Sequence, residues 1–184
     1  MYENNKLDEA GFFYSRMISE VDDRQSFIYH FSAFLSSARS VLQYALSEVE
    51  SKKGKMKEGK QWYLKMVSSS PVLSFFKAER NINIHEKPVK PLRHLIIEPP
   101  PLVIHLSFSA TVVICDKNGN VIHQEEATTP EPKSKQINAP EKVEIKYTFA
   151  DWKGNEDVLT LSKMYLDELR KIVEDGEKNG FLTG

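Results

Sequence analysis

Apolar side chains recur at helical spacing through the first half of the chain. This spacing predicts four helices, over residues 7–22, 24–51, 60–69 and 71–86. The second is the longest, with an apolar stripe that runs from Phe27 to Val49. Asp22 or Asp23 can cap it, and Ser70 followed by Pro71 is typical of the start of the fourth. The pattern predicts an antiparallel helical bundle.

The pattern changes after the fourth helix. Pro88, Pro91 and the run 99–101 predict an extended linker. Segments rich in β-branched residues then predict strands over 102–114, 121–126 and 142–152, with a hairpin turn at 116–120 and a loop at 127–141. We expect these strands to form a small antiparallel meander. Three strands alone are marginally stable, so their apolar face must rest on a helix or a partner chain.

Residues 156–178 return to helical spacing, and Lys178, Asn179 and Gly180 predict the end of that helix. The predicted fold class is α+β. We expect a helical domain over residues 1–90, a Pro-rich linker over 91–101, and a three-stranded antiparallel sheet with a C-terminal amphipathic helix over 102–184.

Composition indicates an ordinary folded protein. The chain has 184 residues, of which 40% are hydrophobic and 28% charged, enough for one good core or two small ones. It has no run of about 18 apolar residues and no signal-like start, so we expect a cytoplasmic location and no membrane contact. The single cysteine, Cys115, lies in an apolar run and is expected to be a small buried side chain.

Charge is distributed unevenly although the net charge is only -1. Residues 52–93 hold 11 Lys and Arg against 3 Asp and Glu. A positive stripe of this kind attracts a polyanion through phosphate contacts. Much of it lies at 52–57, however, which equally fits a solvated loop between helices.

The fourth predicted helix ends in a motif that carries chemistry: Arg80, Asn81 and His85 lie within six residues. In a helix, Asn81 and His85 share nearly one face and Arg80 lies about 100° from Asn81. A guanidinium can hold phosphate oxygens, and an imidazole can transfer a proton near neutral pH. The structural alternative is that Arg80 pairs with a carboxylate and His85 caps the helix end.

This Arg-x4-His motif, with Asn after the Arg on the last helix of an all-α segment, resembles the HEPN superfamily over roughly residues 7–90. The resemblance implies a homodimer whose two motifs face each other across one cleft. It implies a metal-independent endoribonuclease that cuts single-stranded RNA by attack of the 2′-hydroxyl on the adjacent phosphate. Arg80 would then stabilise the phosphate, His85 would handle protons and Asn81 would orient them. Many such nucleases serve in defence or as toxins held in check by an inhibitory partner protein.

One departure concerns the bundle around the motif. In much of the family the motif helix continues or is followed by further bundle helix, whereas Pro88 and Pro91 stop it here. Either the C-terminal helix returns to complete the bundle, or the site is less closed than in the nucleases.

Further candidates flank the motif or lie on the long helix. Lys77, Lys87 and Arg39 are the candidate substrate-binding residues. His30 also lies on the long helix, where a core or surface role is favoured. Trp62 and Tyr63 lie among lysines and could stack bases, but their helical spacing favours the core.

Other catalytic classes find no support in the sequence. His85, His94, His105 and His123 match no ligand spacing, so no metal or other cofactor is expected. No serine elbow, Cys–His pair or helical His-Glu-x-x-His is present. Three hypotheses remain: a HEPN-like nuclease, a HEPN-like module that binds RNA, a nucleotide or a protein without cutting, and an interaction domain in which Arg80 is locked in an ion pair.

Overall fold

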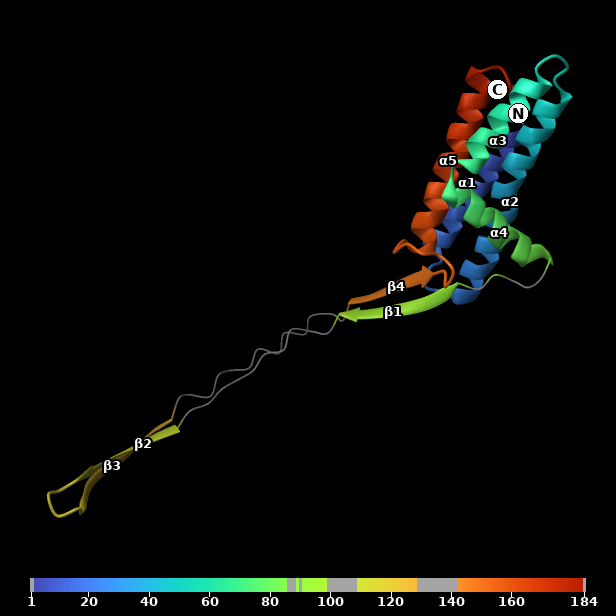
Figure 1. Ribbon diagram of the computed structural model, residues 1–184. Helices are drawn as coiled ribbons and strands as arrows, with labels where there is room; N and C mark the ends of the chain where they lie inside the picture. Colours follow the sequence, from blue (N-terminus) through green and yellow to red (C-terminus); the bar gives the residue numbers. More distant parts are fainter. Residues whose placement is uncertain (1, 86–88, 90, 99–108, 129–141, 184) are drawn as a thin grey trace. The chain divides into compact units, whose positions relative to one another are not determined.

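The computed structural model describes residues 2–85, 89, 91–98, 109–128 and 142–183, which form five helices and four strands. All five helices belong to one compact unit, made of Met1–Ile96 and Glu144–Gly184 (Figure 1). The helices are α1 (Tyr2–Ser19), α2 (Arg24–Ser51), α3 (Met56–Ser68), α4 (Pro71–His85) and α5 (Val158–Lys178). The α+β class and the predicted helices are confirmed.

Two helices begin earlier than the apolar spacing predicts. α1 begins at Tyr2 rather than near Leu7, and α3 begins at Met56 rather than Lys60. The first turn of α1 is polar, so periodicity does not detect it. A tertiary contact holds it instead, because the Asn4 side-chain amide donates to Glu177 Oε1 of α5 at 2.9 Å.

Side chains and prolines set the helix starts as the sequence indicates. Asp23 caps α2 by accepting from the backbone N–H groups of Gln25 and Ser26. The Ser70 hydroxyl accepts from the Leu73 N–H at 3.1 Å, and Pro71 is the first residue of α4. Of the two aspartates offered as a cap for α2, Asp23 therefore holds that position.

α2 is the centre of the helical unit, because it contacts each of the other four helices. Its buried stripe runs from Phe27 to Val49, as predicted. α5 returns to pack against α1, α2 and α4, and contributes Val158, Leu161, Tyr165, Leu169 and Ile172 to the core. Of the two arrangements that the prolines left open, the C-terminal helix therefore completes the bundle.

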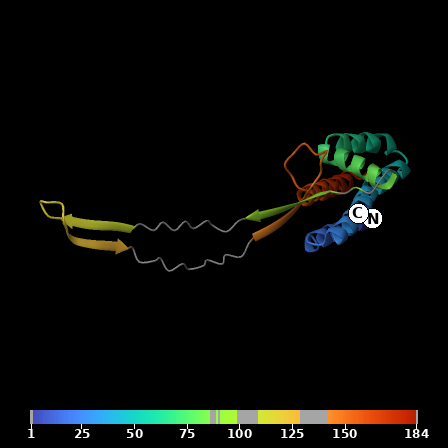
Figure 2. The same ribbon diagram turned by 90° about the horizontal axis from the view of Figure 1, so that it is seen from below.

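The strands are β1 (Leu92–Glu98), β2 (Ser109–Cys115), β3 (Val121–Thr128) and β4 (Lys142–Thr148). Among the described residues they form two two-stranded sheets, β1 with β4 and β2 with β3. Figure 2 shows β1 and β4 side by side. The predicted three-stranded meander is therefore wrong in its pairing, since the last strand joins a strand within the segment expected to be linker.

β4 is held by the helical unit, which explains this pairing. The Tyr147 ring stacks on Phe27 with centroids 3.8 Å apart, and its hydroxyl donates to the Val21 carbonyl at 3.1 Å. Ile145 and Phe149, which alternate with the outward residues, pack against the same core. The apolar face of β4 therefore rests on helices, which is the support that a small sheet needs.

The β2–β3 hairpin belongs to a second unit, Ile97–Val143. Its register pairs Val112 with Glu125, and Gly119 adopts φ +85° in the turn. The Asp116 carboxylate accepts from the Asn118 and Asn120 N–H groups at 2.8 and 2.9 Å, which confirms the predicted turn. Residues 102–108 of the first predicted strand and 129–141 of the predicted loop lie outside the described residues.

Cys115, at the end of β2, is exposed rather than buried as expected. Neighbouring apolar side chains are exposed too, with Val112 at 55% and Ile114 at 51%. No helix in the described part of the chain is long and apolar enough to cross a membrane.

Candidate anion-binding site on the motif helix

The motif lies on α4, which packs one face into the bundle. Val72, Leu73 and Phe76 are buried on that face, and Arg80 continues it one turn after Phe76 as a half-buried side chain. Asn81 is exposed. Because residues 71–85 are helical, Asn81 and His85 share a helix face, as predicted. The His85 side chain and all of Lys87 lie outside what the structure describes.

The Arg80 guanidinium has no carboxylate partner among the described residues. Its Nε atom is buried and has no hydrogen-bond partner. A buried N–H donor without an acceptor lowers the stability of the folded protein. Such a group therefore calls for an explanation, and one explanation is a role in binding. The interaction-domain hypothesis expects an ion pair at Arg80, and the described side chains form none.

Tyr165 of α5 lies beside this arginine. Its ring is buried, stacks on Phe76 with centroids 4.5 Å apart, and meets Phe34 edge-on at 6.1 Å. Burial raises the pKa of Tyr165 well above its ordinary value, while the positive charges of Arg39 and Arg80 act in the opposite direction.

Arg39 of α2 is the second arginine whose positive charge acts on the pKa of Tyr165. It is half-buried, and its positive charge lowers the pKa of the Tyr63 phenol of α3, which burial raises. Like Arg80, it forms no ion pair with a described carboxylate. We call Arg39, Tyr63, Arg80 and Tyr165 the two-arginine site.

The sequence supplied the two arginines of this site, assigned Tyr63 to the core, and missed Tyr165. Tyr165 lies on the apolar stripe of α5, and Tyr63 lies on that of α3, so periodicity assigns both to the core. Tyr63 and Trp62 do pack in the core as predicted, and the Trp62 indole donates to Asp175 at 2.6 Å. Tyr165 can be linked to the motif helix only once it is known that α5 packs against α4.

A buried carboxyl group lies next to Arg80 in sequence without pairing with it. Glu79 is only 7% exposed. Burial raises its pKa, and the negative charge of Asp151 raises it further. Both effects favour the neutral acid.

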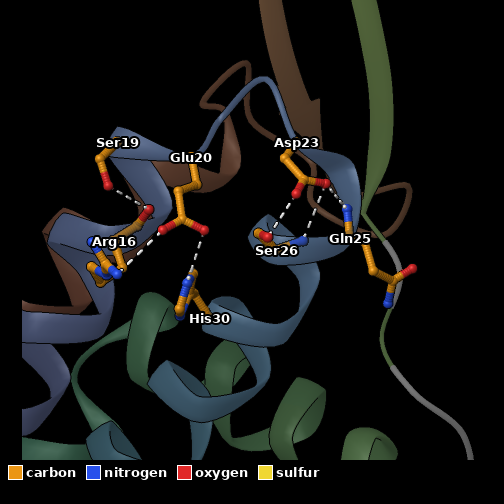
Figure 3. A network of polar contacts seen from close by, with 7 residues as sticks. All are labelled: Arg16, Ser19, Glu20, Asp23, Gln25, Ser26 and His30. Atoms are coloured by element: carbon orange, nitrogen blue, oxygen red, sulfur yellow. Dashed lines mark hydrogen bonds and ion pairs between the residues drawn. The ribbon is translucent and has the colours of Figure 1, made fainter.

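His30 contacts residues of α1 and of the turn after it. Figure 3 shows Glu20 between Arg16 and His30. Glu20 Oε2 lies 3.2 Å from His30 Nε2, and its other oxygen lies 3.5 Å from Arg16. The imidazole also stacks near the Phe13 ring, with centroids 6.2 Å apart. A structural role, which the sequence favoured, accounts for these contacts.

The basic segment is only partly neutralised within the protein. Lys52 pairs with Glu48 at 3.2 Å and Lys60 with Glu50 at 2.8 Å. Lys77 is exposed on α4 and forms no ion pair with a described residue. It therefore remains available to a polyanion that approaches α4.

The two described histidines on the strands contact different residues. His94 Nε2 lies 2.8 Å from Thr148 Oγ1, and His123 Nε2 lies 3.7 Å from Glu125. His105 lies outside the described residues. No group of three or more His, Cys, Asp or Glu side chains in the described ranges is arranged to hold a metal ion.

No protein-family model, curated protein or solved structure matches this chain. The resemblance to the HEPN superfamily therefore rests on Arg80, Asn81 and His85 and on the helices around them.

Proposed function

We propose that this protein is a HEPN-like RNA-binding protein that cuts single-stranded RNA without a metal ion, as a homodimer in the cytoplasm. The observation that carries the proposal is that Arg80 lies half-buried on the motif helix, with a buried Nε that has no hydrogen-bond partner and no carboxylate partner among the described residues. An arginine kept free of carboxylates is suited to hold a phosphate.

The chemistry assigned to the motif is an internal transfer. The 2′-oxygen attacks the adjacent phosphorus, and the bond from phosphorus to the 5′-oxygen breaks. His85 moves the proton from the 2′-hydroxyl toward the leaving 5′-oxygen, while Arg80 stabilises the charge that builds on the phosphate. Asn81 orients these groups. The products are a 2′,3′-cyclic phosphate and a 5′-hydroxyl end. The reaction needs neither an oxidant nor a metal ion.

A non-catalytic RNA-binding module is the second candidate, and the surface charge of α4 supports it. Binding needs only phosphate contacts from Arg80, Arg39 and exposed cations such as Lys77, with no proton transfer. It predicts an affinity that falls steeply with salt.

Cleavage of a labelled single-stranded RNA pool in EDTA tests both candidates. The wild type is compared with His85→Ala, Arg80→Ala and the control Lys171→Ala, which removes an exposed cation of α5. Cleavage that yields cyclic-phosphate ends and is lost in the first two variants but kept in the control supports the nuclease.

Absence of cleavage with salt-sensitive binding that weakens in Arg80→Ala supports the binding module. Neither cleavage nor binding by the wild type would overturn both. Light scattering of the wild type at micromolar concentration tests the homodimer separately, since a monomer would leave the composite cleft without its second half.

A further inference from the structure

The β2–β3 hairpin has no third strand among the described residues, in which β2 and β3 pair only with each other (Figure 1). Its described apolar side chains are exposed, and none belongs to the helical core. A two-stranded hairpin is at best marginally stable in water, because stability needs a further strand or a surface that covers one face. The described residues of the chain supply no such strand to the hairpin.

The two edges of the hairpin differ in charge. β2 (Ser109–Cys115) contains no charged residue, whereas β3 (Val121–Thr128) contains Glu125 and Glu126. Every second residue of an edge strand directs its backbone N–H and C=O groups away from the hairpin, where another strand can bind them. Carboxylates on an edge repel a second copy of the same edge, so β2 is the edge that favours pairing with its own copy.

Alternation along β2 places an apolar stripe beside its free edge. Val112 and Ile114 lie on the same face of the strand and are 55% and 51% exposed. The register of the hairpin pairs Val112 with Glu125 and Ile114 with His123. Glu125 and His123 lie 3.7 Å apart on β3. The stripe therefore has a polar border on the side of β3, and no described residue borders it on the other side.

We propose that β2 pairs antiparallel with β2 of a second copy of this chain, with Val112 of each copy at the two-fold axis. Val112 is the middle residue of Ser109–Cys115, so this register uses all seven residues of the strand. The resulting four-stranded sheet has Val112 and Ile114 of both copies at its centre. His123 and Glu125 of both copies form its rim, and an apolar centre with a polar rim is the usual composition of a protein interface.

The charge of β3 limits this assembly to a dimer. Once two copies of β2 have paired, the outer strands of the sheet are the two β3 strands, each with Glu125 and Glu126. These carboxylates oppose the addition of a further hairpin. The inference does not depend on the proposed function, because Val112 and the motif residue Arg80 belong to different compact units.

Sedimentation velocity of the full chain, from micromolar to near-millimolar concentration, tests the pairing. The wild type is expected to dimerise. Val112→Lys is expected to raise the dimer Kd at least about tenfold, because it removes apolar contacts and brings two like charges together at the axis. The hairpin itself keeps its fold, since the new lysine lies opposite Glu125 and forms a favourable cross-strand pair. The control Ile122→Lys makes a similar change at a 67% exposed residue of β3 and should dimerise as the wild type does.

Disulfide formation tests the register. In a Cys115→Ser background, which removes the single cysteine of the chain, Val112→Cys places two thiols opposite each other across the axis. Mild oxidation is expected to link this dimer at least about tenfold faster than it links Ile122→Cys in the same background, because opposite residues of paired strands lie within disulfide range. Equal rates in the two variants would contradict the register.

A wild type that stays monomeric overturns the proposal and leaves this edge to a strand of another protein. A dimer that is as tight in Val112→Lys as in the wild type also overturns it, and RNA cleavage by that dimer would leave the proposed function standing. Loss of the dimer in Val112→Lys with RNA cleavage retained supports pairing through β2, and contradicts instead the cleft shared between two motifs.

Discussion

Glu79 shows how a single buried acid links the motif helix to pH. Its pKa is raised from the ordinary value of 4.5 by burial and by the charge of Asp151. The folded state therefore keeps a proton that the unfolded chain releases at lower pH. The free energy of unfolding should fall as pH rises from 4.5 through the raised pKa, and remain lower above it.

Glu79→Gln is accordingly expected to be more stable than the wild type at pH 8, with the difference shrinking toward pH 4. Urea unfolding at several pH values measures it. The control Glu174→Gln changes an exposed carboxylate of α5 and should follow the wild-type pH dependence. A Glu79→Gln variant that is less stable than the wild type at pH 8 would show instead that the carboxylate makes a stabilising contact.

Tyr147 carries the attachment of β4 through one hydroxyl and one ring. Tyr147→Phe keeps the stack on Phe27 but leaves the Val21 carbonyl without its donor. We expect a loss of about 0.5–1.5 kcal/mol in the free energy of unfolding, measured by urea denaturation. Tyr29→Phe, which alters a tyrosine that is 65% exposed, should leave stability nearly unchanged. Equal losses in both variants would contradict the assigned bond.

At the candidate site, the charged residues could be identified from the sequence, but the buried tyrosine Tyr165 could not. Arg39 and Arg80 stand out in the sequence for their chemistry, and the positive charges of both lower the pKa of the buried Tyr165. Tyr165 could not be selected, because a tyrosine on an apolar stripe gives the same pattern whether or not its hydroxyl meets a cation. That information lies in the contact between α4 and α5, which no local pattern contains.

Among the elements, helices were predictable because each carries its own stripe and caps. β1 was not, although Leu92–Glu98 contains four apolar residues. Prolines at 91 and 99 frame it as a linker, and its partner β4 lies more than forty residues later in the chain. Strand pairing over such a separation depends on where Tyr147 and its neighbours dock, and not on the sequence of β1.

Two helix glycines offer a matched test of packing. A Cβ at Gly176 of α5 would lie 2.6 Å from Leu182 Cδ1 and 2.8 Å from Trp62 Cη2, whereas a Cβ at Gly11 of α1 meets nothing within 4 Å. Gly11→Ala is expected to stabilise by about 0.5–1 kcal/mol through helix propensity. Gly176→Ala gains the same propensity but overpacks, at a cost of about 1–3 kcal/mol, so we expect a net loss of about 1 kcal/mol.

Thermal and urea unfolding of both glycine variants measure these differences. Stabilisation by Gly176→Ala would mean that Leu182 and Trp62 move aside at little cost. Destabilisation by Gly11→Ala would mean that the added methyl group meets a neighbour, contrary to the open space around Gly11.

In the whole molecule, the helical core draws on no described residue of the second unit, Ile97–Val143. Replacing residues 99–141 by a short Asn-Gly-containing turn should therefore leave a folded helical unit, with a Tm within about 3 °C of the wild type. Circular dichroism during heating measures this. Loss of a cooperative transition in the shortened chain would show that the second unit supports the first.

Truncation after Asp157 serves as the opposite case. It removes α5 and with it nine residues assigned as buried in that helix. We expect no cooperative unfolding transition in this variant, because α2 would expose the stripe that α5 covers.

The return of α5 also sets when the protein can fold during its synthesis. Glu177 bonds to Asn4, and Phe34 of α2 meets Tyr165 on a helix that is made more than a hundred residues later. While the ribosome is still adding the second unit, the aromatic stripe of α2 has no α5 to cover it. The nascent chain therefore presents Phe34 and its neighbours to the cell throughout that interval, and such exposed surface is what chaperones bind and what drives aggregation. Pausing of translation before Val158 should for this reason lower the yield of native protein more than pausing after Lys178.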